Sequence, residues 1–180
     1  MQKDNHGHRW PSFTPPLVVV AALACGAVGV VVGSAVVGAQ TEQTQPALFV
    51  SVDAYRTFDS RVDPWFLKVP VGSVQEVSPQ YVPGQLEINE LPAGTVAVTY
   101  NVTVTDTEGA GYVQIGALPL TEGSSSNVNW SEPGQTVANS GITRVETSDG
   151  GSLSFGFVVG GTVDARTHVI IDISGYFVEA

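Results

Sequence analysis

Cysteine is almost missing from this chain, because its 180 residues include only Cys25. Cys25 lies in an apolar run near the N-terminus, so the region after residue 39 has no cysteine at all. That region can form no disulfide, offers no thiolate to a metal and has no cysteine nucleophile. Its fold must depend on a hydrophobic core, and roughly 135 residues can bury about two-thirds of the surface that the unfolded chain exposes.

Basic residues are also scarce. After residue 39 there are five lysines and arginines against sixteen acidic residues, a net charge of −11. Nucleic acid and anionic lipid surfaces attract proteins of the opposite sign. The composition therefore argues against nucleic acid and against anionic lipid surfaces as partners of this region.

Histidine is limited to His168 in the same region. A serine–histidine–acid triad needs a histidine beside a serine elbow such as GxSxG, and that motif is absent. Zinc sites usually combine several histidines or cysteines, and calcium sites need more oxygen ligands than the turn DTEG, residues 106–109, provides. We expect no metal ion, no cofactor and no enzymatic activity, with His168 at the rim of a sheet.

One long hydrophobic run does occur, over residues 17–39. Its 23 uncharged residues would form a helix of roughly 34 Å, enough for a hydrocarbon core of about 30 Å. Lys3 and Arg9 precede this run, whereas the next basic residue is Arg56. By the positive-inside rule, residues 1–16 lie in the cytoplasm and the chain after the run lies outside the cell.

The alternative interpretation of the same run is a cleaved export signal. Val37, Gly38 and Ala39 have the short side chains that signal peptidase requires, so cleavage would follow Ala39 and the protein would be secreted. The run is longer than a usual signal core, and we therefore expect a retained single-pass anchor. Residues 40–46, QTEQTQP, are polar and are interpreted as a linker to a domain at 47–180.

Alternation of apolar and polar residues is the main pattern of that domain. In TVAVTYNVTVT, residues 95–105, the even positions from Val96 to Val104 are apolar or aromatic and the odd positions are mainly threonine. A period of two over this length predicts a strand with one buried face. The same alternation occurs in three further runs, each of which is predicted to bury one face. The predicted core residues of these runs are Val113, Ile115 and Ala117; Leu153, Phe155, Phe157 and Val159; and Val169, Ile171, Ile173 and Phe177.

Clusters of turn residues separate these runs, among them TEGAG, TEGSSS and SDGG. We count eight or nine short strands and no helix after residue 45. A sheet must bury its apolar face against a second layer. The expected fold is therefore all-β, an antiparallel β-sandwich of jelly-roll or immunoglobulin-like type, preceded by one N-terminal transmembrane or signal helix.

Four stretches in a fixed order carry a resemblance to a known kind of domain. They are YRTFDSR (55–61), AVTYNVTVTDTEGAGYVQIG (97–116), SSSNVNWSEPGQTVANSGI (124–142) and HVIIDISGYF (168–177). The region from about Leu48 to Phe177 resembles a β-rich module of secreted and cell-surface proteins of actinobacteria. The resemblance implies an all-β accessory or surface domain and assigns no ligand or catalytic residue. The chain departs from it in a longer, more acidic segment at 62–89.

The stretch YRTFDSR combines three charged residues, Arg56, Asp59 and Arg61. Arginine forks and a carboxylate at this spacing form charge-assisted hydrogen bonds. Since no histidine, cysteine or serine elbow accompanies them, we interpret the three residues as a structural clamp. The clamp is predicted to connect the start of the first strand to its neighbour.

Aromatic side chains are the candidates for ligand binding, because flat rings stack on sugars and peptides. Trp65 follows a proline in the divergent segment and is the best candidate for an exposed ring. Trp130 shares a face with Val128, so the sequence is equally consistent with a core residue and with a binding residue there. Tyr81 and Tyr112 are the other two candidates for ligand binding.

The functional hypothesis is a membrane-tethered, extracytoplasmic and non-enzymatic domain that binds cell-wall polysaccharide or a surface protein. A secreted carbohydrate-binding module is the first alternative. A small glycan hydrolase is the second, because such an enzyme needs two carboxylates across a cleft. Candidates for that pair are Asp53, Asp59, Asp63, Asp164 and Asp172.

Overall fold

The computed structural model describes residues 46–62, 67–84, 89–147 and 150–180. The anchor or signal segment 17–39, the cytoplasmic residues 1–16 and all of the linker except Pro46 lie outside these ranges. Every regular element within the described ranges is a β-strand. None of the described residues belongs to a helix that is long and apolar enough to cross a membrane.

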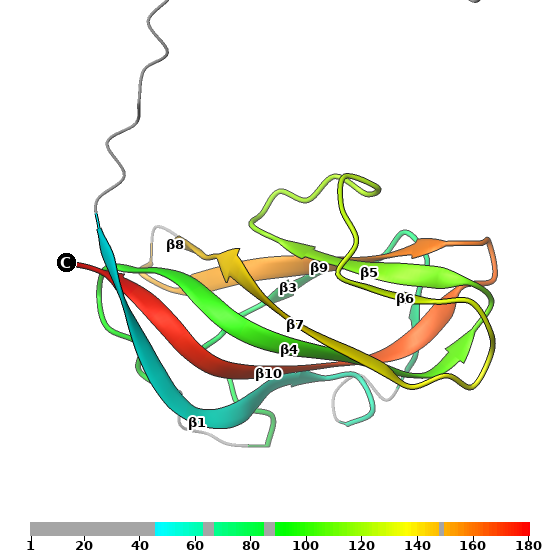
Figure 1. Ribbon diagram of the computed structural model, residues 1–180, viewed down its shortest axis with the longest axis horizontal. Coiled ribbons are helices and arrows are strands. Elements are labelled where there is room, and N and C mark those ends of the chain that lie inside the picture. Colours follow the sequence, from blue (N-terminus) through cyan, green and yellow to red (C-terminus); the bar gives the residue numbers. More distant parts are fainter. Residues whose placement is uncertain (1–45, 63–66, 85–88, 148–149) are drawn as a thin grey trace, which may run out of the picture. The chain divides into compact units, whose positions relative to one another are not determined.

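Two antiparallel sheets form the domain (Figure 1). Sheet A has the order β1-β10-β4-β7, and the short β2 pairs with the first residues of β10. Its strands are β1 (Ala47–Asp59), β2 (Val69–Pro70), β4 (Thr95–Glu108), β7 (Val137–Arg144) and β10 (Arg166–Glu179).

Sheet B has the order β3-β9-β5-β6, and the short β8 pairs with β9. Its strands are β3 (Val74–Val77), β5 (Gly111–Gly116), β6 (Val128–Trp130), β8 (Glu146–Thr147) and β9 (Leu153–Gly161). The ribbon shows the two sheets as the two layers of a sandwich (Figure 1). The prediction of an all-β, antiparallel sandwich is confirmed.

The core lies between the sheets and includes most of the side chains that the alternation predicted, whereas Val96 and Ala117 are only half-buried. Phe58 and Phe157 come from different sheets, and their ring centroids are 5.1 Å apart in an edge-to-face arrangement. The fully buried core residues include Val98, Val102 and Val104 of β4, Val113 of β5, Phe155, Phe157 and Val159 of β9, and Val169, Ile171 and Ile173 of β10.

The predicted face of β10 is wrong at its C-terminal end. The pairing of β10 with β4 shifts between Ile173 and Gly175, which inserts a bulge and reverses the side-chain alternation. Tyr176 therefore packs against the core. Phe177 instead lies beside Phe49 of β1, with ring centroids 5.2 Å apart.

The outer side of sheet B is covered by the segment between β5 and β6, residues 117–127. Gln114 of β5 is 2% exposed, and its amide group donates hydrogen bonds to the carbonyl of Thr121 (3.0 Å) and the hydroxyl of Ser124 (2.8 Å). Its carbonyl accepts the backbone N–H of Gly123 (3.1 Å). Gln114 thus attaches the middle of the covering segment to the sheet, and Asn127 attaches its end through the backbone N–H of Ile115 at 2.6 Å.

Candidate functional site

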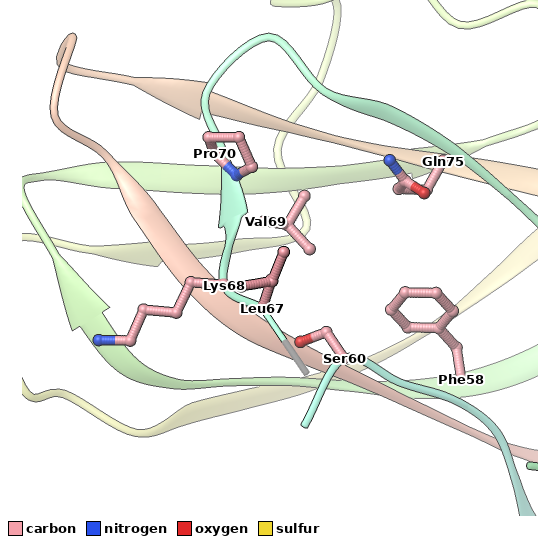
Figure 2. A pocket seen from close by; sticks show the side chains of 7 residues that line it. All are labelled: Phe58, Ser60, Leu67, Lys68, Val69, Pro70 and Gln75. Carbon is pink, nitrogen blue, oxygen red and sulfur yellow. The ribbon is translucent and has the colours of Figure 1, made fainter. Parts of the chain in front are cut away.

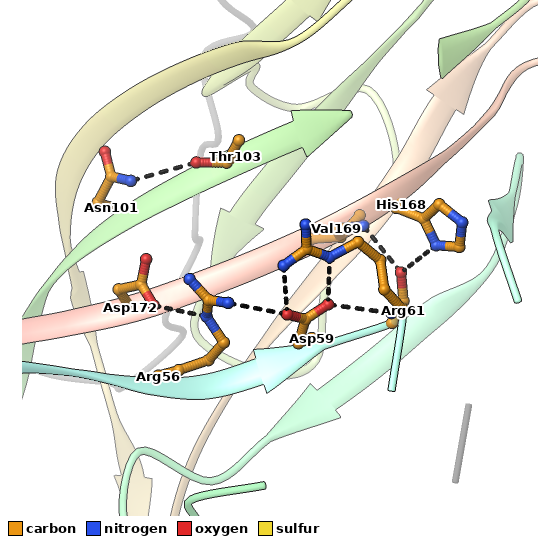
Figure 3. A network of polar contacts seen from close by, with 9 residues as sticks. Arg56, Asp59, Arg61, Asn101, Thr103, His168, Val169 and Asp172 are labelled. Carbon is orange, nitrogen blue, oxygen red and sulfur yellow. Dashed lines mark hydrogen bonds and ion pairs between the residues drawn. The ribbon is translucent and has the colours of Figure 1, made fainter. Parts of the chain in front are cut away.

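The predicted clamp residues are in contact at the end of β1 (Figure 3). The carboxylate of Asp59 accepts hydrogen bonds from the backbone N–H, Nε and Nη2 of Arg61 at 3.0, 2.9 and 2.7 Å. It also accepts one from Nη1 of Arg56 at 2.9 Å. Nε of Arg56 reaches the carboxylate of Asp172 on β10, also at 2.9 Å. The network therefore ties the end of β1, rather than its predicted start, to β10.

This arrangement makes Asp59 unsuited to act as a general base or nucleophile. Its side chain is 3% exposed and four donors occupy its two oxygens. Burial alone would raise the pKa of the carboxyl, but the hydrogen bonds from Arg61 and the charges of Arg61 and Arg56 outweigh burial and lower the pKa from its ordinary value of 3.8. A carboxylate held in this state is a poor proton acceptor at neutral pH.

A serine and a histidine meet next to the network, which sequence reasoning did not anticipate. The hydroxyl of Ser60 lies 3.1 Å from Nδ1 of His168 and accepts the backbone N–H of Val169 at 3.0 Å. Ser60 is fully buried, and its oxygen is already engaged by both groups. A nucleophile must reach its substrate, so we assign this pair to the attachment of the β1 end to β10.

The four aromatic candidates do not form a common surface in the described part of the chain. Trp65 lies outside the described residues. Trp130 is 4% exposed and donates its indole N–H to the carbonyl of Glu108, so it is a core residue. Tyr81 is 42% exposed beside β1, where its carbonyl accepts the hydroxyl of Thr57.

Tyr112 is half-buried on the other sheet. A Cβ atom at Gly160 would lie 2.2 Å from its ring, so the tyrosine packs directly on the glycine of the neighbouring strand β9. Only Tyr81 among these residues presents a substantial part of its ring to solvent in the described structure. A stacking platform built from several rings is therefore not assembled there.

The outer side of sheet A carries many polar side chains. We call it the polar face. Asn101 of β4 lies between Asp172 of β10 and Ser140 of β7 in the register, and Arg56 of β1 continues the row beyond Asp172. The face consists of Arg56, Thr99, Asn101, Thr103, Thr105, Thr136, Ser140, Asp172 and Ser174.

Hydrogen bonds connect these side chains both along β4 and between strands. The hydroxyl of Ser140 donates to the amide oxygen of Asn101 at 3.2 Å, and the amide nitrogen of Asn101 donates to the hydroxyl of Thr103 at 3.3 Å. Two further pairs join hydroxyl groups, Thr99 with Ser174 at 3.1 Å and Thr105 with Thr136 at 2.7 Å. Each hydroxyl and amide retains a free donor or acceptor site.

A second charged cluster lies at the far end of β4, where the turn DTEG is found. Nζ of Lys68 lies 2.8 Å from the carboxylate of Asp106 and 2.7 Å from that of Glu108. Glu108 also pairs with Arg166. The hydrogen bonds from Lys68 and Arg166 lower the pKa of Glu108. The described residues include no group of three or more histidine, cysteine or acidic side chains placed to hold a metal ion.

One small pocket opens near Ser60 at the edge of the sandwich (Figure 2). Its volume of about 150 Å³ is below the roughly 300 to 1,000 Å³ of ordinary ligand pockets. The walls are mainly apolar, and His168 is not part of them. The lining residues are Phe58, Ser60, Leu67, Lys68, Val69, Pro70 and Gln75.

The chain was also compared with known proteins. No protein-family model, curated protein or solved structure matches it.

Proposed function

We propose that this protein is a non-enzymatic, extracytoplasmic β-sandwich domain, tethered to the cell membrane through residues 17–39, that binds cell-wall polysaccharide with the polar face of sheet A. The observation that carries the proposal is a row of polar groups across four neighbouring strands, in which Arg56 and Ser140 are exposed and Asp172 and Asn101 are half-buried. Such groups are donors and acceptors suited to the hydroxyls of a glycan.

We infer that the sandwich is of the jelly-roll type. Without the two-residue strands β2 and β8, eight strands remain in the described region. Numbered along the chain, their order is 1-8-3-6 in one sheet and 2-7-4-5 in the other. This order supports a jelly roll, an architecture that is also used by lectins. The analogy concerns the fold and adds only a general expectation about function.

The chemistry of the polar face favours a glycan over a protein partner. Protein interfaces derive most of their affinity from buried aromatic and aliphatic anchors. On the outer side of sheet A, the large hydrophobic side chains of Ile142 on β7 (62%) and Phe49 on β1 (53%) are well exposed, but both lie outside the row of polar groups that carries the proposal. The strands also hold the polar groups at fixed spacing, which reduces the entropy lost when a repeating polymer binds.

Binding of the full-length protein to purified wall polysaccharide tests the proposal. Asn101→Ala together with Ser140→Ala removes two central hydrogen-bonding groups, each of which contributes about 0.5 to 1.5 kcal/mol. We expect an affinity that is lower by roughly tenfold. The control is Ser125→Ala with Ser126→Ala, which removes two exposed hydroxyls from the segment over sheet B.

Equal binding by the polar-face variant and the wild type would overturn the assignment of the surface. Loss of binding in Trp65→Ala or Tyr81→Ala, with the polar-face variant unaffected, would instead support a carbohydrate-binding module that stacks sugars on aromatic rings. Glycan hydrolysis that an aspartate-to-asparagine substitution abolishes would support the hydrolase alternative.

A further inference from the structure

The first strand has a free edge that differs between its two halves. β1 is the terminal strand of sheet A, and within the described residues β10 is its only partner strand. The second half of this edge is covered, since the hydroxyl of Thr57 donates to the carbonyls of Ser78 and Tyr81 and the hydroxyl of Tyr55 donates to that of Pro79. No such contact is made by residues 47–51 in the described structure.

The uncovered half has none of the features that usually prevent edge strands from pairing. Residues 47–51, ALFVS, contain no charge and no proline. Leu48 is 61% exposed and Phe49 is 53% exposed. The only pairing irregularity of this half comes after Ser51. Edge strands of monomers are normally protected by charges, prolines or bulges.

We propose that residues 47–51 of β1 pair with the same residues of a second copy of this chain, in antiparallel orientation about a two-fold axis. Side chains alternate along a strand, so a two-fold pair must be centred on a residue. Centring on Phe49 is the register that pairs all five residues, with Ala47 opposite Ser51 and Leu48 opposite Val50 of the other copy. No charged residue is then placed opposite another.

This register also buries the exposed apolar groups. Leu48 and Val50 face their counterparts on one side of the joined sheet. On the other side, Phe49 meets its own copy, and the two Phe177 rings, each 5.2 Å from its Phe49, enlarge the aromatic cluster. Aromatic pairs across strands stabilise a sheet.

The membrane tether of the proposed function would favour the pairing of two β1 strands. The pairing itself does not depend on the tether. A linker of seven residues spans at most about 25 Å. Two tethered copies would therefore hold their β1 edges at similar heights above one membrane, which raises their effective concentration. A second copy is thus the partner that fits this edge.

Disulfide cross-linking of the full-length protein in membranes tests the register. In a Cys25→Ser background, Phe49→Cys places two cysteines opposite each other at about 4.5 to 5.5 Å between Cα atoms, within disulfide range. Ala54→Cys is the control on the same strand, because its two copies would lie roughly 33 Å apart. We expect efficient cross-linking at position 49 and little at position 54.

Absence of a cross-link at position 49, or equal yields at both positions, would overturn the proposal. A second variant separates the strand contact from any association of the N-terminal segments. Phe49→Lys should convert the detergent-purified full-length protein from dimer to monomer, whereas Ile142→Lys, at an equally apolar exposed site on β7, should not. A dimer that persists in Phe49→Lys would contradict the strand pairing, whatever the polysaccharide-binding result.

Discussion

The carboxylate of Asp59 is buried and accepts four hydrogen bonds from Arg56 and Arg61. Asp59→Ala removes it and leaves Arg56 and Arg61 without this partner. Breaking a buried pair costs about 3 to 5 kcal/mol. Because both arginines are more than 40% exposed and can be hydrated, we expect about 2 to 3 kcal/mol less stability.

Urea unfolding of the full-length protein measures this difference, and Asp53→Ala is the control because Asp53 is an exposed aspartate on the same strand. The control should change stability by less than about 0.5 kcal/mol. An unchanged unfolding midpoint in Asp59→Ala would contradict the structural role. A large loss in both variants would indicate a general sensitivity of β1 rather than the clamp.

The same carboxyl should make stability depend on acid. Its pKa is lowered in the folded protein below 3.8, so the unfolded state binds a proton first as the pH falls. The stabilisation is therefore complete well above the unfolded pKa and is lost as the pH decreases through about 4 toward the folded pKa. The stability difference between wild type and Asp59→Asn should be constant from pH 6 to 8 and shrink near pH 3. A difference that does not change with pH would exclude this linkage.

At the scale of elements, the buried amide of Gln114 makes three hydrogen bonds to the segment over sheet B. Gln114→Ala removes all three hydrogen bonds to Thr121, Ser124 and Gly123. We expect a loss of about 1 to 3 kcal/mol and much faster hydrogen exchange in residues 117–127, because the segment opens locally. Ser126→Ala changes an exposed hydroxyl of the same segment and should leave exchange unaffected.

The pairing of elements also explains the error in β10. A period of two assigns Phe177 to the same side as Ile173, but one bulge reverses the assignment for every later residue. Bulges depend on the partner strand as much as on the bulged strand. The sequence of β10 alone therefore could not reveal that Tyr176 would take the core position.

At the scale of the whole molecule, the prediction concerns where the N-terminal segment places the domain. We expect the protein isolated from cells to remain with the membrane fraction and to retain residues 1–39, because the apolar run is long enough to span the bilayer. Intact-mass measurement checks this directly. A mature form that begins at Gln40 would show that the segment is a cleaved signal, and the domain would then be secreted.

Much of the fold could be predicted from the sequence, because alternation along a strand reports burial without knowledge of the partner strand. Val98, Val102 and Val104 were expected in the core and are fully buried there. The contact of Arg56 and Arg61 with Asp59 was also predictable locally, since Asp59 is two or three residues away from them. The additional contact with Asp172 is separated by 116 residues along the chain, and nothing in the sequence indicates it.

The sequence by itself determined that the region after residue 39 is acidic, free of cysteine and built from amphipathic strands, because these properties belong to single residues and to their immediate neighbours. The tertiary structure decided which strands lie side by side, and it thereby placed Asn101 beside Ser140 and brought Ser60 to His168. Among the described residues, it also left one half of the β1 edge without a contact. The physical reason is that antiparallel pairing depends on cross-strand contacts between distant segments. The stretch YRTFDSR contains the side chains that attach the end of the first strand to the last strand.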